Sequence, residues 1–230
     1  MLEVADRVVM VSGAARGIGR ATVEALLAAG YRVSAGVREA RGLVASDRLM
    51  VQRYDAESLE SAEAWVDATV ARWGVLHGLV NAAGINPEFK VTDADETALD
   101  ALWAVNVKGP LRLSRLALPH LRKVGAGRIV VIASLSGKRV RNASAGYQMS
   151  KFAVIGMTHS LRLEGWDDGV RATVLCPGFV ETDMTAAAQF PREEMSKPAD
   201  VAALIETLMR LPNTAVVAEL LVNCRFETVL

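Results

Sequence analysis

The spacing of hydrophobic positions changes repeatedly along the chain. Seven short runs are rich in apolar residues, and some are apolar at every position, as strands buried on both faces are. These runs cover residues 7–12, 32–37, 49–54, 78–81, 128–134, 171–177 and 216–223. Longer segments with helical spacing of apolar residues separate them. This alternation predicts parallel strands that are joined by helical crossovers.

The clearest helical pattern lies between the third and fourth runs. One face of this helix would carry Leu59, Ala62, Val66, Thr69, Val70 and Trp73. The acidic residues Glu60, Glu63 and Asp67 would then face solvent. No repeat, low-complexity tract or linker divides the chain. We therefore expect one α/β domain over residues 1–230, a Rossmann-type doubly wound parallel sheet with helices on both faces.

Composition and charge narrow the class of protein. The 230 residues carry 26 Lys and Arg against 26 Asp and Glu, so neither nucleic acid nor an anionic membrane surface is an expected partner. No apolar stretch reaches the roughly 18 residues of a membrane helix, and the first residues do not resemble a secretion signal. Cys176 and Cys224 have no second Cys or His at ligand spacing, which disfavours zinc and a disulfide framework. We expect a soluble, cytoplasmic protein.

A glycine-rich turn follows the first predicted strand. Residues 12–19 read Ser-Gly-Ala-Ala-Arg-Gly-Ile-Gly and lead into a predicted helix that ends near Gly30. Glycine allows a tight turn and the close approach of a pyrophosphate, whose negative charge the N–H groups and dipole of the helix start can hold. The spacing differs from G-x-G-x-x-G and lacks the Lys-Ser/Thr of a nucleoside triphosphate loop. The alternative is a turn without a ligand, which would leave three costly glycines idle.

This turn resembles the Thr-Gly-x3-Gly-x-Gly motif of the short-chain dehydrogenases and reductases, with Ser12 in place of threonine. Four further motifs of that family follow in order. They are Asn81-Ala82-Ala83-Gly84, Asn106 in a long predicted helix, Ser134 with Tyr147-x3-Lys151, and Pro177-Gly178-x3-Thr182. The resemblance runs from residue 6 to about residue 222. It implies an oxidoreductase that transfers a hydride between a nicotinamide cofactor and a carbonyl or secondary alcohol.

The resemblance implies four catalytic residues. Ser134 would polarise the substrate carbonyl, Tyr147 would transfer the proton, and Lys151 would also hold the nicotinamide ribose. Asn106 would position a water that relays protons to Lys151. Residues four apart share one face of a helix, and a nearby ammonium stabilises a phenolate, so we expect Lys151 to lower the pKa of Tyr147. Ser136 is the competing hydroxyl, and no hydrolase motif surrounds Ser134.

The resemblance also implies a set of cofactor-binding residues. Asp55 would accept a hydrogen bond from the adenine amino group, and Val180 and Thr182 would bind the carboxamide. The expected set is Gly13, Ala15, Arg16, Gly17, Ile18, Gly19, Arg38, Asp55, Asn81, Ala82, Gly84, Tyr147, Lys151, Pro177, Gly178, Val180 and Thr182. No metal is expected.

The end of the second predicted strand bears on the choice of cofactor. A carboxylate there would bind the adenosine ribose of NAD(H) and repel a 2′-phosphate. Val37 takes that position and Arg38 follows it, while Arg16 could approach the same phosphate from the glycine turn. We therefore expect NADP(H) over NAD(H). Two alternatives stay open: Glu39 becomes the ribose ligand if the strand ends two residues later, or Arg16 and Arg38 are merely solvated.

The expected activity is that of a ketone or aldehyde reductase acting on a small molecule. The alternative is a non-catalytic dinucleotide-binding redox sensor or regulator on the same fold, against which the retained Ser134, Tyr147 and Lys151 argue. Residues 86–89, 135, 140–143, 179 and 184 are expected to line a mostly apolar substrate pocket. Lys138, Arg139 and Arg141 would favour an acidic substrate unless they are solvated surface residues.

The resemblance also implies a state of assembly, and this sequence departs from the family pattern at three places. Relatives form homodimers or homotetramers through the long helices, here about residues 96–124 and 148–166, so we expect a homo-oligomer. His77 stands where relatives often have Asp, and Ala82 replaces an Asn. The residues after Val222 lack the Gly-Gly of many relatives, so a role of this tail in substrate closure or assembly does not carry over.

Overall fold

The computed structural model describes residues 1–227 of the chain. Seven parallel strands form one sheet in the order β3-β2-β1-β4-β5-β6-β7. The strands are β1 (Val8–Ser12), β2 (Arg32–Val37), β3 (Leu49–Arg53), β4 (Gly78–Asn81), β5 (Arg128–Ile132), β6 (Arg171–Pro177) and β7 (Glu219–Val222). The order changes direction between β1 and β4, where doubly wound folds bind their ligands. The predicted fold class is confirmed.

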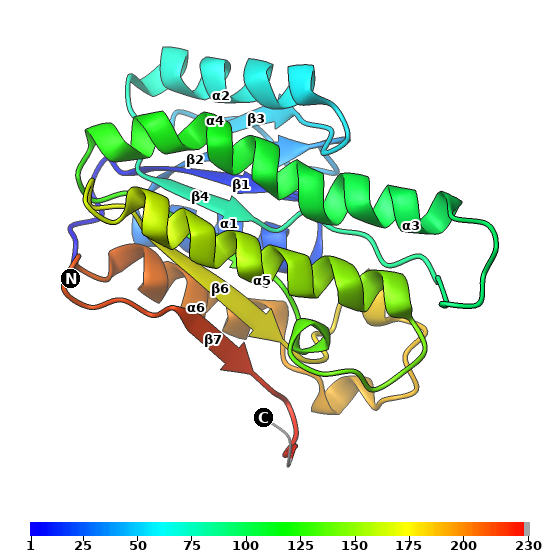
Figure 1. Ribbon diagram of the computed structural model, residues 1–230. Helices are drawn as coiled ribbons and strands as arrows, with labels where there is room; N and C mark the ends of the chain where they lie inside the picture. The colour runs from blue at the N-terminus through cyan, green and yellow to red at the C-terminus, as the bar shows by residue number, and fades with distance from the viewer. Residues whose placement is uncertain (228–230) are drawn as a thin grey trace.

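Helices cover both faces of this sheet (Figure 1). The helices α1 (Gly17–Ala29) and α6 (Pro198–Arg210) pack on one face, and α2 (Leu59–Trp73), α4 (Gly109–Lys123) and α5 (Ala145–Gly165) pack on the other. The short helix α3 (Thr97–Leu102) continues through a π-helical turn, Trp103–Lys108, into α4. Each face of the sheet therefore has its own hydrophobic core.

Several predicted element boundaries differ from the observed ones. The third and fifth predicted strands end one and two residues early, at Arg53 and Ile132, and the seventh covers only Glu219–Val222. The fifth strand stops because Ser134 begins a short 3-10 helix, Leu135–Gly137, and its Oγ accepts a hydrogen bond from the N–H of Ser136 at 3.0 Å. Ser134 thus lies beyond the strand that it was expected to end.

The buried face of α2 also differs from the predicted one. Trp65 is fully buried, whereas Leu59 at the helix start is exposed. The indole N–H of Trp65 donates to Ser34 Oγ at 2.8 Å. Its ring covers Gly36 near the end of β2, where a Cβ atom would lie 2.4 Å from the ring. Gly36 is therefore required for this packing.

His77 precedes β4 and has a structural role. Its Nδ1 accepts a hydrogen bond from the N–H of Val8 at 3.0 Å. Burial lowers the pKa of His77 to about 4, and Arg7 acts in the same direction. The imidazole is therefore neutral at pH 7 and links two neighbouring strands.

Within residues 1–227, no helix is long and apolar enough to cross a membrane. Nor do these described residues hold a group of three or more His, Cys, Asp or Glu side chains that is arranged for a metal ion.

Candidate active site

A cavity of about 580 Å³ opens at the carboxyl end of the sheet, between the β1–α1 turn and the loops after β4, β5 and β6. Most of the predicted site residues line it. They are Gly13, Ala15, Arg16, Gly17, Ile18, Gly19, Arg38, Asp55, Ala82, Gly84, Ser134, Tyr147, Lys151, Pro177, Gly178, Val180 and Thr182. The predicted residues that do not reach the wall are Asn81 and Asn106.

The glycine turn packs tightly against the segment after β4. Gly13 has a φ of +67°, and a Cβ there would lie 2.8 Å from the Ala83 backbone. Ser12 Oγ accepts hydrogen bonds from the N–H groups of Ala82 and Ala83 at 3.0 and 3.1 Å. Helix α1 then begins with no side-chain cap and no acidic residue in its first turn. A helix start of this kind suits a bound pyrophosphate.

Asn81 does not face this cavity. It is buried, and its Nδ2 donates to Ser114 Oγ on α4 at 3.0 Å. The structure therefore does not bring this predicted cofactor residue to the cavity wall. The side chain instead joins β4 to the helix that covers it.

Asn106 is also buried, in the π-helical turn. Its Oδ1 accepts from the N–H of Ile85 at 2.9 Å, and its Nδ2 donates to Ile85 O at 3.0 Å and to Ser150 Oγ at 3.1 Å. It thus joins the loop after β4 to α5, behind the cavity wall. A sequence signal for the irregular turn is Pro110, which has no N–H to donate to the Asn106 carbonyl four residues earlier.

Tyr147 and Lys151 lie one turn apart on α5, and both face the cavity. The Lys151 Nζ lies 5.4 Å from the centroid of the Tyr147 ring and donates to the Ile132 carbonyl at 3.0 Å. Burial raises the pKa of Tyr147 to about 12, although its interaction with the Ser134 hydroxyl opposes this shift. Burial lowers the pKa of Lys151 to about 8.

The expected lowering of the Tyr147 pKa by Lys151 is therefore wrong. The ammonium lies over the ring and donates to a backbone carbonyl, while Lys151 is buried and Tyr147 is half-buried. Withdrawal from water disfavours the charged forms of both side chains.

The strand β2 ends at Val37, as predicted, and Arg38 follows it in an exposed position. Arg38 lines the cavity together with Arg41 and Arg53. Arg16 also lines it, but its Nη1 lies 3.0 Å from Asp183 Oδ2, so its side chain turns towards the loop after β6.

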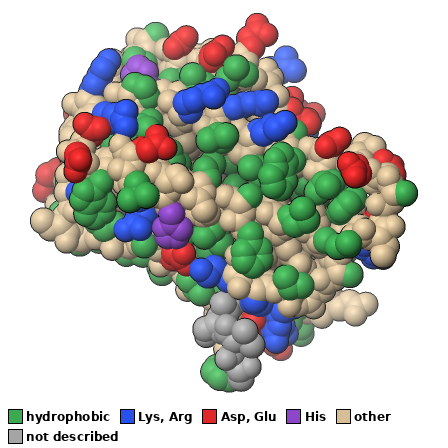
Figure 2. All heavy atoms as spheres, viewed as in Figure 1, with side chains coloured by type: hydrophobic (Ala, Val, Ile, Leu, Met, Phe, Trp, Pro, Cys, Tyr) green, Lys and Arg blue, Asp and Glu red, His purple; other side chains and the backbone are tan. Residues whose placement is uncertain are grey.

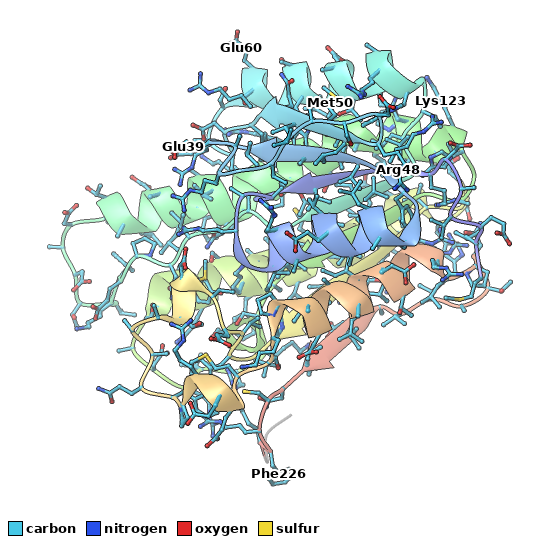
Figure 3. The ribbon with its side chains drawn as sticks, turned by 180° about the vertical axis from the view of Figure 1, so that it is seen from behind. Glu39, Arg48, Met50, Glu60, Lys123 and Phe226 are labelled. Atoms are coloured by element: carbon cyan, nitrogen blue, oxygen red, sulfur yellow. The ribbon has the colours of Figure 1, made fainter. Side chains whose placement is uncertain are left out.

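Two carboxylate side chains also lie at the carboxyl end of the sheet. Glu39, labelled in Figure 3, lies 4.0 Å from Arg41, and both residues line the cavity. Asp55 follows β3 by two residues and also lines the cavity. Its Oδ1 accepts a hydrogen bond from the N–H of Glu57 at 3.0 Å.

The predicted substrate pocket is only partly observed. Met184 lines the cavity, whereas Phe89 and Leu135 are buried in the protein interior. Val140 and Asn142 line a separate hollow of about 720 Å³ that lies beside the outer face of α5. Of these five residues, Met184 lies in the same cavity as Ser134 and Tyr147, and the substrate pocket stays a prediction.

The three predicted basic residues near the substrate are paired within the chain. Lys138 Nζ lies 2.7 Å from Glu219 Oε2. Arg139 and Arg141 lie 2.8 and 3.1 Å from Glu227 Oε2. They therefore do not form the free basic cluster that would favour an acidic substrate.

Comparisons with known proteins support a common family. The pattern of the short chain dehydrogenase family matches residues 7–192. Agropine synthesis reductase of Rhizobium rhizogenes is 40% identical over 229 residues, which is 96% of this chain and 53% of that protein. The chain thus spans about half the length of the agropine synthesis reductases that it matches.

Two further relatives match along most of their length. Acetoacetyl-CoA reductase of Synechocystis is 34% identical, over 89% of this chain and 88% of that protein. The crystal structure of a short chain dehydrogenase from Burkholderia cenocepacia in complex with NADP is 28% identical, with a TM-score of 0.88 over 96% of this chain and 98% of that one. By the extent of these matches, the chain belongs to the short-chain dehydrogenase family of oxidoreductases.

Proposed function

We propose that this protein is an NADP(H)-dependent reductase of ketones or aldehydes. The observation that carries the proposal is the convergence of Ser134, Tyr147 and Lys151 on the cavity that contains the glycine turn. A dinucleotide held along this cavity would place its pyrophosphate at the start of α1, while three polar side chains face the other end. The bound nicotinamide would supply the hydride, which no protein side chain provides.

Three side chains would handle the proton and the carbonyl oxygen. Ser134 can donate a hydrogen bond to that oxygen and so favour the negative charge that grows on it. Tyr147, whose pKa is about 12, keeps its proton at neutral pH and can transfer it to the forming alkoxide. Lys151 would hold the nicotinamide ribose.

The preference for NADP(H) rests on the basic end of the cavity. Arg38 directly follows Val37, and no carboxylate stands at the end of β2. Arg16 and Arg41 line the same region, although each lies beside a carboxylate, Asp183 and Glu39. A 2′-phosphate would find guanidinium groups here that suit its charge and shape.

The proposed carbonyl substrate agrees with the names of two relatives, an agropine synthesis reductase and an acetoacetyl-CoA reductase. The test is the absorbance at 340 nm of the purified protein with NADPH or NADH and a panel of ketones and aldehydes. Oxidation of NADPH with formation of the alcohol is the expected result. NADPH binding without turnover of any compound would contradict the proposal and favour a redox sensor.

We also propose that the protein acts as a homo-oligomer in the cytoplasm. Apolar side chains gather over α4 and α5 on the face seen in Figure 2. Among them, Leu111, Met149, Phe152 and Leu163 are exposed. Burial of such a patch stabilises an assembly of like chains. A monomer at micromolar concentration in analytical ultracentrifugation would contradict the proposed homo-oligomer.

The proposed cytoplasmic location agrees with the cysteines. Cys176 and Cys224 are both free thiols, as in the reducing cytoplasm.

A further inference from the structure

A carboxylate after β7 is enclosed by three arginines. The side chain of Glu227 is only 3% exposed, and Arg139 donates two hydrogen bonds to it, at 2.8 and 2.9 Å. Arg141 Nη1 lies 3.1 Å from the same carboxylate, and Arg225 Nε lies 3.8 Å from it. Paired hydrogen bonds from one guanidinium are the strongest form of this interaction. The hydrogen bonds from Arg139 lower the pKa of Glu227 to about 2, so the carboxylate is charged at neutral pH.

Arg139 connects this carboxylate to Ser134. The Ser134 carbonyl accepts from the N–H of Gly137 at 2.9 Å, and the Leu135 carbonyl accepts from the N–H of Arg139 at 3.2 Å. These bonds make residues 134–139 one compact turn. Lys138 in the same turn is held by Glu219 of β7. A shift of Arg139 would therefore move the Ser134 hydroxyl.

Arg225 connects the same carboxylate to the loop after β6. Its guanidinium carbon lies 5.2 and 5.9 Å from the ring centroids of Phe190 and Phe179. The two rings stack with their centroids 5.0 Å apart. Phe179 lies between Gly178 and Val180, both of which line the cavity. Cation–π contacts of this kind restrain the rings that they cover.

The residues that lead from β7 to Glu227 also pack against the two loops beside the cavity. The N–H of Gly178 donates to the Val222 carbonyl at 2.8 Å. A Cβ at Gly178 would lie 3.0 Å from Asn223 Oδ1 and 3.2 Å from Leu135. The turn after Ser134, the loop after Pro177 and residues 222–227 thus meet beside the cavity.

We propose that Glu227 is a positioning residue, which holds the turn of Ser134 and the loop of Phe179 in the geometry that carbonyl reduction needs. This inference rests on the proposed function. A misplacement of about 1 Å in reacting groups can cost about a hundredfold in rate. Loss of the Glu227 carboxylate would leave three arginines close together without their common anion, so they would repel one another and both segments would move.

The test compares three variants with the wild-type protein. Glu227→Ala removes the carboxylate, and Glu227→Gln keeps its size but not its charge. Glu206→Gln is the matched control, because Glu206 also has a mostly buried side chain (18% exposed) that lies near an arginine, Arg210, at 3.7 Å. It lies on α6 and does not line the cavity. The readouts are amide hydrogen exchange of residues 135–141 and 178–190, kcat and KM for the carbonyl substrate, and the Kd of NADPH.

The expected result for both Glu227 variants is faster exchange in the two segments, kcat reduced at least about tenfold, and KM for the carbonyl substrate raised. The Kd of NADPH should also rise, because Gly178 and Val180 of the second segment line the cavity proposed for the dinucleotide. The control should behave like the wild type. Acetate should restore kcat to Glu227→Ala, because it can refill the space between the arginines, whereas chloride at equal ionic strength should not.

Wild-type exchange rates in both Glu227 variants would overturn the proposal. Faster exchange with unchanged kcat and KM would also overturn it, since Glu227 would then only stabilise the fold. A wild-type protein that reduces no carbonyl compound would instead refute the proposed function. In that case the exchange data alone would still decide whether Glu227 orders the two segments.

Discussion

Lys151 on α5 donates a hydrogen bond to the carbonyl of Ile132, the last residue of β5, at 3.0 Å. This bond holds the Lys151 side chain against the carboxyl end of β5, two residues before Ser134. The Gly84 backbone approaches from the other side, where a Cβ would lie 3.9 Å from Nζ and 3.4 Å from Asn106 Oδ1. The ammonium is thus held where β4, β5 and α5 meet.

Tyr147→Phe tests the proton donor. The change removes one hydroxyl and little packing, so dinucleotide affinity should stay near that of the wild type. The kcat for reduction should fall by about a hundredfold or more, because general acid catalysis commonly contributes that much. Steady-state kinetics and NADPH fluorescence titration measure the two quantities. A variant that keeps more than about a tenth of the wild-type kcat would exclude Tyr147 as the general acid.

The pKa of Lys151 predicts a pH dependence of activity. Burial lowers this pKa to about 8, so the ammonium that would hold the ribose is lost as the pH rises through 8. The kcat/KM for NADPH, which reports ionisations of the free protein, should therefore fall above about pH 8. In Lys151→Arg the guanidinium keeps its charge, so this fall should disappear. The same alkaline fall in both proteins would assign it to another group.

Local spacing explains why much of the site could be predicted from the sequence. Tyr147 and Lys151 are four residues apart, and any helix places such residues on one face. The glycine turn is equally local, since Gly13 and Gly19 contact each other within one βα unit. The strands were predicted from short apolar runs, but several predicted strand ends differ from the observed ones.

The features that the sequence did not predict depend on distant contacts. Arg139 and Glu227 are 88 residues apart, and no short-range pattern joins them. The pKa of Tyr147 was predicted in the wrong direction, because burial, which raises it, outweighs the hydrogen bond with Ser134, which lowers it. Trp65 faces the core in place of Leu59, because its indole ring packs on Gly36 and donates a hydrogen bond to Ser34 Oγ.

Gly36→Ala tests the contact between β2 and α2. The new Cβ would lie 2.4 Å from the buried ring of Trp65, so the ring or the strand must move. We expect a loss of about 1–3 kcal/mol in the free energy of unfolding, measured by urea denaturation. Trp65→Leu in the same chain should recover part of it. Gly156→Ala on α5 is the control, because a Cβ there meets nothing within 4 Å and should stabilise the helix.

Arg38→Asp tests the proposed choice of NADP(H). The change replaces the cation after β2 with a carboxylate, which would accept from the ribose hydroxyls and repel a 2′-phosphate. The ratio of kcat/KM for NADPH to that for NADH should fall at least about tenfold, a change of about 1.4 kcal/mol. Arg48→Asp makes the same charge change just before β3, at the opposite end of the strands from Glu39 in Figure 3, and should leave the ratio unchanged. A wild-type preference for NADH would refute the prediction and indicate Glu39 as the ribose ligand.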